Sequence, residues 1–276
     1  MRQDVLQAVA LCSFGNQFFR SGEDRGPELR LTNANFKTAC EIGFERGPEA
    51  GILAGTAADG TSSWFRRMKH EGAENLVLAL ANCPYMQNDP RGPWGVMIET
   101  DRGTEIWQPT WKLRSVGDND ATPWRVTYLA KKANRWDVKN PLPPQEAAAK
   151  IESVCKEAIA NLEPTQPTFS AALARCLYFF NSGNDDLNGV LDLYASGTES
   201  WGRVLFSMAV RLGTLLQSKN WKQVYSESGA DSSFSAITNT LWELAMTTFE
   251  AAMIATGEIE TALAQPRALE DLSQAS

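Results

Sequence analysis

Three prolines within four residues, in the segment Asn140-Pro141-Leu142-Pro143-Pro144, constrain the fold of this chain more than any other feature. Proline fixes φ and lacks a backbone N–H, so this segment can continue neither a helix nor a central strand. We therefore expect a linker here. The spacing of apolar residues differs on its two sides, which predicts two domains, residues 1–141 and 142–257. Residues 258–276 contain Pro266 and few large apolar side chains, so they form a C-terminal tail in this scheme.

Charge and aromatic residues follow the same division. The 276 residues carry a formal net charge of −7. Residues 1–141 hold 18 Lys and Arg against 17 Asp and Glu, whereas residues 142–276 hold 8 against 16. Six of the nine tryptophans belong to the first part. Because 43% of the residues are hydrophobic, the composition excludes wholesale disorder and is sufficient for a large buried core.

The second part has helical periodicity throughout. Apolar residues recur at i, i+3, i+4 and i+7, as on one face of an amphipathic helix. Thr168 is a suitable N-cap for the second of these segments, and Gly183 is a stop signal after it. Short connections favour antiparallel neighbours, and hence an all-α helical bundle. The helical segments centre on residues 151–162, 169–180, 187–194, 201–212, 221–225 and 234–248.

The first part is broken often by Gly and Pro, and its short segments are rich in β-branched and aromatic residues. Asp101-Arg102-Gly103 reads as a hairpin turn in which the glycine supplies positive φ. Residues 4–19 fit a helix or a strand, 49–63 a loop, and 64–71 a short helix. Strands are predicted at 36–46, 75–81, 94–100, 104–113 and 124–130. The predicted fold is therefore α+β, with a β-rich antiparallel N-terminal module followed by an all-α helical bundle.

Cysteine and histidine usage limits the chemistry. The five cysteines form no Cys-x-x-Cys pair, and His70 is the single histidine, so we predict neither a metal site nor a cofactor. An odd number of scattered cysteines fits reduced thiols. The start, residues 1–4, lacks a basic stretch followed by an apolar block, and no apolar run approaches the roughly 20 residues of a membrane span. We expect a cytoplasmic protein without a membrane partner. The cysteines are Cys12, Cys40, Cys83, Cys155 and Cys176.

Motifs for nucleotide or acyl chemistry are missing. The sequence contains no phosphate-binding loop, no dinucleotide fingerprint and no Gly-x-Ser-x-Gly elbow. The acidic groups at 117–120 and 183–186 could offer oxygen ligands to Mg²⁺ or Ca²⁺, but neither follows the calcium-loop pattern. Turn and helix-cap roles account for both.

Two residues remain as candidates for catalysis. His70 lies among cations and next to Glu71, which could orient it only if the two side chains face each other. Cys83 precedes Pro84 at the end of an apolar segment, where a nucleophile could stand, but no activating partner can be named. A surface histidine and a small buried cysteine are the alternative interpretations.

Basic and aromatic residues alternate in three segments, as in proteins that hold single-stranded nucleic acid with cations on phosphates and rings under bases. Between residues 102 and 139 there are eight Lys and Arg against four Asp and Glu. On a strand, however, Trp124, Val126 and Tyr128 share one face and Arg125 the other, which equally indicates a buried aromatic face and a solvated basic face. The candidate contacts are Arg66, Arg67, Lys69, Lys112, Arg114, Arg125, Lys131, Lys132 and Arg135, with Trp64, Trp111 and Trp136 as stacking platforms.

No catalytic constellation emerges, whereas amphipathic and aromatic surface is plentiful. The sequence therefore favours a non-enzymatic binding or assembly subunit that docks a macromolecular partner, most simply a protein, through both of its parts. One alternative is an accessory protein that binds single-stranded RNA or DNA. A second is a hydrolase that uses Cys83 or His70.

Overall fold

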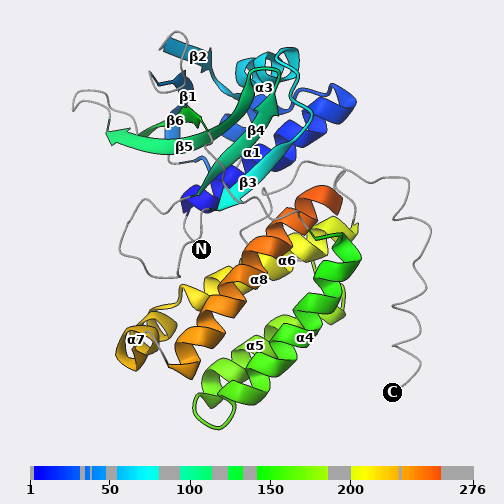
Figure 1. The fold of residues 1–276 in the computed structure, drawn as a ribbon, viewed down its shortest axis with the longest axis vertical. Coiled ribbons are helices and arrows are strands. Elements are labelled where there is room, and N and C mark those ends of the chain that lie inside the picture. Colours follow the sequence, from blue (N-terminus) through cyan, green and yellow to red (C-terminus); the bar gives the residue numbers. More distant parts are fainter. Residues whose placement is uncertain are drawn as a thin grey trace.

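Helices and a single sheet make up the computed structural model (Figure 1). It describes residues 3–31, 35–37, 39–47, 55–80, 94–113, 124–132, 142–185, 200–229 and 232–255. Within these residues there are eight helices and six strands. The expected mixed α+β class is confirmed.

The six strands form one sheet in the order β2-β1-β6-β5-β4-β3. Strands β3 to β6 follow one another as an antiparallel meander, whose last strand returns to lie parallel to β1. The prediction of an antiparallel module is therefore wrong at this one pair. The chain between the parallel partners β1 and β6 includes α3 and four other strands, which provides the long crossover connection that a parallel pairing needs. The strands are β1 (Ala39–Arg46), β2 (Gly55–Asp59), β3 (Leu76–Leu80), β4 (Trp94–Thr100), β5 (Gly103–Leu113) and β6 (Trp124–Lys132).

Strand β2 lies within the segment 49–63, for which the sequence predicted a loop. Its residues, Gly-Thr-Ala-Ala-Asp, have a low preference for strands. Antiparallel pairing with β1 supplies the backbone hydrogen bonds that stabilise it, with a register shift between Phe44 and Glu45. The predicted hairpin turn is confirmed, because β4 and β5 pair across it and Gly103 has a φ of 106°.

Three helices from the first part pack on one face of the sheet: α1 (Gln3–Ser21), α2 (Gly26–Leu31) and α3 (Thr61–His70). The ambiguous segment 4–19 is thus a helix. Gly15 allows the close approach of α1 to β3, because a Cβ there would lie 2.3 Å from Leu76 Cδ1. The neighbouring Asn16 bonds the backbone of β3 through both ends of its amide. Its Nδ2 donates to Leu76 O (3.0 Å) and its Oδ1 accepts from Leu76 N (2.6 Å).

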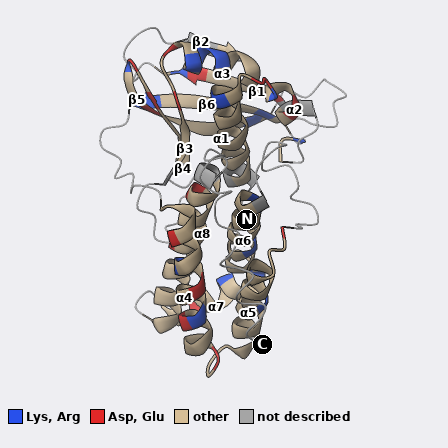
Figure 2. Ribbon diagram, turned by 90° about the vertical axis from the view of Figure 1, so that its right-hand side faces the viewer, with Lys and Arg blue, Asp and Glu red and all other residues tan. Residues whose placement is uncertain are grey.

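Four helices of the second part surround a common core. In the described residues α4 contacts α5, α5 contacts α6, α6 contacts α8, and α8 returns to α4, while α7 packs on α8. Helix α8 also contacts α1 and β3, so α8 joins the four helices to the part that contains the sheet (Figures 1 and 2). The helices are α4 (Pro144–Leu162), α5 (Pro167–Asn181), α6 (Ser200–Leu216), α7 (Lys219–Ser228) and α8 (Ser233–Ala255).

Helix boundaries agree with the local signals, with one exception. Gly183 follows α5 with a φ of 67°, as its stop signal predicted. The N-cap of α5 is Gln166 instead of Thr168, because Pro167 takes the first helical position. The predicted helix at 187–194 lies outside the described residues. Buried apolar residues form one continuous cluster that extends from the sheet into the four helices.

Candidate functional site

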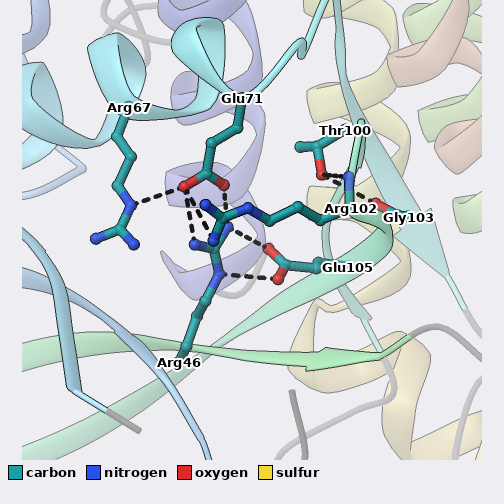
Figure 3. A network of polar contacts seen from close by, with 7 residues as sticks. All are labelled: Arg46, Arg67, Glu71, Thr100, Arg102, Gly103 and Glu105. Carbon is teal, nitrogen blue, oxygen red and sulfur yellow. Dashed lines mark hydrogen bonds and ion pairs between the residues drawn. The ribbon is translucent and has the colours of Figure 1, made fainter. Parts of the chain in front are cut away.

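Charged side chains converge at one place in the interior, where Arg46 bridges two buried glutamates (Figure 3). Arg46 is the last residue of β1, Glu71 directly follows α3, and Glu105 lies near the start of β5. Arg46 Nε donates to Glu105 Oε1 (2.8 Å) and Nη1 donates to Glu71 Oε1 (3.0 Å). Further bonds run from Nη2 to both carboxylates. The three side chains are almost completely buried, and we call them the buried ion network.

Two more arginines surround Glu71. Arg67 Nε on α3 donates to Glu71 Oε1 (3.0 Å), and Arg102 Nη1 lies 3.7 Å from the same oxygen. The turn that carries Arg102 is anchored to this point as well, because Asp101 N donates to Glu71 O (2.9 Å). The network thus connects β1, β5, the end of α3 and the β4–β5 turn (Figure 3).

The pKa values of Glu71 and Arg46 are both shifted away from neutral pH. Burial by itself raises the pKa of Glu71, but hydrogen bonds from Arg46 and Arg67 and the charges of Arg46 and Arg102 outweigh it and lower the pKa to about 2. The hydrogen bonds that Arg46 donates to Glu71 and Glu105 raise the pKa of Arg46, although burial opposes them. A general acid or base needs a pKa near the working pH. We therefore interpret the network as structural.

An aromatic cluster lies beside the network and explains why Trp64 is inside. The rings of Phe44 and Trp64 are stacked with centroids 4.2 Å apart, and Trp107 meets Trp64 edge-on at 5.4 Å. Arg46 Cζ lies 5.8 Å from the Trp107 ring centroid. Trp64 is completely buried. This corrects the prediction that it is a stacking platform, because no base can reach its ring.

Two large exposed apolar side chains of the sheet lie where β5 ends and β6 begins. Leu113 and Trp124 are directly opposite in register, with 63% and 37% of their surface exposed. The half-buried Trp111 meets Trp124 edge-on at 6.4 Å. By strand alternation these three side chains share the face that the helices cover further along the sheet. We call Trp111, Leu113 and Trp124 the strand-end patch.

Cations next to this patch belong to the other face of the sheet. Lys112 and Arg125 are opposite each other in register, and Arg125 Nη2 is 2.9 Å from Glu41 Oε1. Lys131 is on the same face of β6 as Arg125 and lies six residues further along the strand, which corresponds to about 20 Å between the two residues. Lys112, Lys131 and Lys132 are exposed and make no ion pair with any residue that the structure describes.

Helix α3 uses its cations for packing. Arg66 Nη2 donates to Asp24 Oδ2 (2.5 Å), and Arg67 bonds Glu71. Lys69 Nζ donates to Phe19 O (3.0 Å) and so satisfies a carbonyl at the end of α1. The predicted basic residues that the structure describes are therefore not on one surface, but are divided between α3, the end of β5 with the start of β6, and the end of β6.

Of the residues proposed for hydrolysis, the structure describes only His70. His70 is exposed at the end of α3, and Glu71 turns into the buried ion network instead of orienting it. Burial raises the pKa of Cys12, and it raises that of Cys155 to about 12 and that of Cys176 to about 11. These thiols are protonated at neutral pH and poor nucleophiles. Cys83, Arg114, Arg135 and Trp136 lie outside the described residues.

Sequence reasoning missed the buried ion network. Its members are separated by 25 and 59 residues, and each was placed only as part of its own segment. Among the described residues, no group of three or more His, Cys, Asp or Glu could hold a metal ion. None of the helices in the described ranges combines the length and apolar character needed to cross a bilayer.

Comparisons with protein-family models, with curated proteins and with solved structures find no match to this chain.

Proposed function

We propose that this chain is a non-enzymatic binding or assembly subunit that docks a macromolecular partner, and that the strand-end patch is part of the docking surface. The observation that carries the proposal is the exposure of Leu113 and Trp124, side by side at the end of the sheet. Contiguous exposed apolar side chains are costly in water, and aromatic residues are enriched where proteins meet. In this proposal a protein partner covers the side chains of Leu113 and Trp124.

The buried ion network supports a non-enzymatic role. Its two carboxylates are paired with Arg46, and Glu71 also with Arg67 and Arg102, and the three side chains of the network are buried out of reach of a substrate. Its role in this proposal is to fix β1 and β5 relative to each other across β6, so that the strand ends present a rigid surface. The free thiols Cys12, Cys155 and Cys176 favour a reducing compartment, so we place the encounter in the cytoplasm.

The proposal also includes two structural units: residues 1–141 with the sheet and residues 142–257 with the four-helix core, followed by the tail 258–276. All six strands belong to the first unit and α4 to α8 to the second, which supports this division. Each unit then offers its own surface to a partner.

Photo-crosslinking tests the docking surface. Benzoylphenylalanine replaces Leu113 in the full chain, and Glu74, an exposed residue of the same unit outside the patch, is the matched control position. We expect a discrete protein adduct from position 113 in cells of the native host, no such adduct from position 74, and no effect of nuclease. Trp124→Ser should reduce the adduct. Absence of an adduct at 113 would contradict the proposal.

A second candidate function is binding of single-stranded nucleic acid, favoured by Lys112, Lys131 and Lys132, which make no ion pair within the described ranges. Binding through these residues would weaken steeply with salt and would be lost in the variant with all three changed to glutamate. Lys112 and Lys131 lie on the face opposite to Trp111 and Trp124, and Lys132 shares the face of these rings only at the far end of β6, which favours the protein partner. An adduct at position 113 that nuclease removes would reverse this order.

A further inference from the structure

A second exposed surface lies on the four helices, far in sequence from the strand-end patch. Tyr178 of α5 is 68% exposed, more than any other large apolar residue in the described ranges. Arg175 precedes it by one helical turn, Phe179 follows it, and Arg211 of α6 reaches the ring of Phe179. We call Arg175, Tyr178, Phe179 and Arg211 the α5 patch.

The two guanidinium groups of the α5 patch share one aromatic ring. Arg211 Cζ is 4.3 Å and Arg175 Cζ is 5.4 Å from the centroid of Phe179, so the two cations lie within about 10 Å of each other. Arg211 is oriented by Ser207 Oγ (3.2 Å) and Asn184 Oδ1 (3.3 Å). The ring of Tyr178 is 5.9 Å from that of Phe179. Such contacts hold the cations in place before any ligand arrives, which reduces the entropy cost of binding.

This clustering of cations is unusual for its surroundings. Residues 142–276 hold 8 basic and 16 acidic residues, and two of the eight cations meet at Phe179. Elsewhere in this part Lys156 pairs with Glu152 and Arg203 pairs with Asp185. Arg175 makes no ion pair with any described residue. A carboxylate from another molecule can therefore pair with Arg175 without displacing an internal partner.

We propose that the α5 patch docks a short acidic segment of a partner protein. Carboxylates of the segment pair with Arg175 and Arg211, and an apolar side chain of the segment packs on Tyr178. Tyrosine and arginine are the residue types most enriched at the energetic centres of interfaces. The patch favours a short segment because the surrounding part carries a net charge of −8, which repels a long nucleic acid or an anionic membrane beyond the patch itself.

The inference does not depend on the strand-end patch, and its test is separate. The probe is a fluorescein-labelled peptide of four Asp-Phe repeats, compared with Asn-Phe and Lys-Phe peptides of equal length by anisotropy with the full chain. We expect the Asp-Phe peptide to bind about tenfold more tightly than the Asn-Phe peptide at low salt, and more weakly as salt is added. The Lys-Phe peptide should not bind.

Single variants locate the site. Arg175→Ala should weaken binding of the Asp-Phe peptide by about fivefold, because one charge-assisted contact is lost. Tyr178→Ser should also weaken it. Lys219→Ala, which removes another exposed cation of the same part, is the matched control and should leave the affinity unchanged. Circular dichroism melting curves verify that the variants fold.

Three results would overturn the inference. The first is equal affinity for the Asp-Phe and Asn-Phe peptides, and the second is equal weakening in Lys219→Ala and Arg175→Ala. The third is tighter binding of a single-stranded RNA that is lost in Arg175→Ala, which would assign the patch to nucleic acid. None of these results changes the expected adduct at position 113, so the two proposals can fail separately.

Discussion

Arg46 is the residue on which the geometry of the sheet depends most directly. It comes from β1, and its two carboxylate partners come from the end of α3 and from β5. Removing one member of a buried ion pair leaves the other charge without compensation, which costs more than the pair itself contributes. The network therefore stabilises one particular arrangement of these elements and penalises all others.

Arg46→Ala should lower the free energy of unfolding by about 3–5 kcal/mol, because Glu71 and Glu105 then lose their common buried partner. Urea unfolding followed by circular dichroism measures the change. Arg66→Ala is the control, since it removes the exposed partner of Asp24 and should cost at most about 1 kcal/mol. Similar losses in the two variants would contradict a special role for the buried ion network.

Glu71 makes stability depend on pH in a definite direction. Its pKa is about 2 in the folded chain, below the ordinary value of 4.5 that applies when the chain is unfolded. The stabilisation is fully present above the unfolded value and is lost as the pH falls from about 5 towards 2. In Glu71→Gln this contribution is absent. The difference in unfolding free energy between the original chain and the variant should therefore shrink steadily over this range, and a constant difference would refute the assignment.

At the scale of elements, the contact between α1 and β3 supplies hydrogen-bond partners to the backbone at one edge of the sheet. The amide of Asn16 bonds both the N–H and the C=O of Leu76, as a neighbouring strand would. β3 is an edge strand, and unpaired edge groups are sites for unwanted pairing. A helix side chain thus takes the place of a seventh strand at this residue.

Asn16→Ala tests how far β3 depends on the hydrogen bonds from the Asn16 amide. The buried N–H and C=O of Leu76 lose their partners, at a cost of about 1–3 kcal/mol for each unsatisfied group. Hydrogen exchange at the Leu76 amide should become faster by a corresponding factor. Ser21→Ala, which removes an exposed bond to Gln17 O, is the control and should leave that amide unchanged. Unchanged exchange in Asn16→Ala would show that the bond contributes nothing.

At the scale of the whole molecule, α8 joins the two proposed units. It contributes to the four-helix core and also contacts α1 and β3. The buried apolar cluster is continuous across this junction. Two units that share a core in this way are expected to stabilise each other, even if each can fold alone.

A fragment of residues 142–257 tests this division. We expect it to be helical and to unfold cooperatively, because the four-helix core is closed without the sheet. Its melting temperature should be lower than that of the full chain, since the face of α8 that meets α1 and β3 becomes exposed. Circular dichroism melting of the fragment and of the full chain compares the two. An unfolded fragment would place the boundary elsewhere.

Local features of the fold were predictable because neighbouring residues encode them. The apolar repeat over 151–162 becomes the buried side of α4, and Gly103 and Gly183 have the positive φ that their positions required. For the candidate site the sequence named Trp111 but not its neighbours Leu113 and Trp124, and the nucleic-acid alternative needed Trp64 on the surface, where the structure buries it. A strand pattern gives two alternating faces without saying which face is covered.

The sequence by itself determined most helices of the second part, five of the six strands, the change from strand to helical periodicity near residue 141, and the absence of familiar catalytic motifs, since each depends on spacing within a few residues. Only the tertiary structure decided that β1 runs parallel to β6, that Arg46 reaches Glu71 and Glu105, and that Tyr178 and Leu113 face solvent. These contacts join residues far apart along the chain. Their free energy comes from packing and desolvation, which no local pattern records.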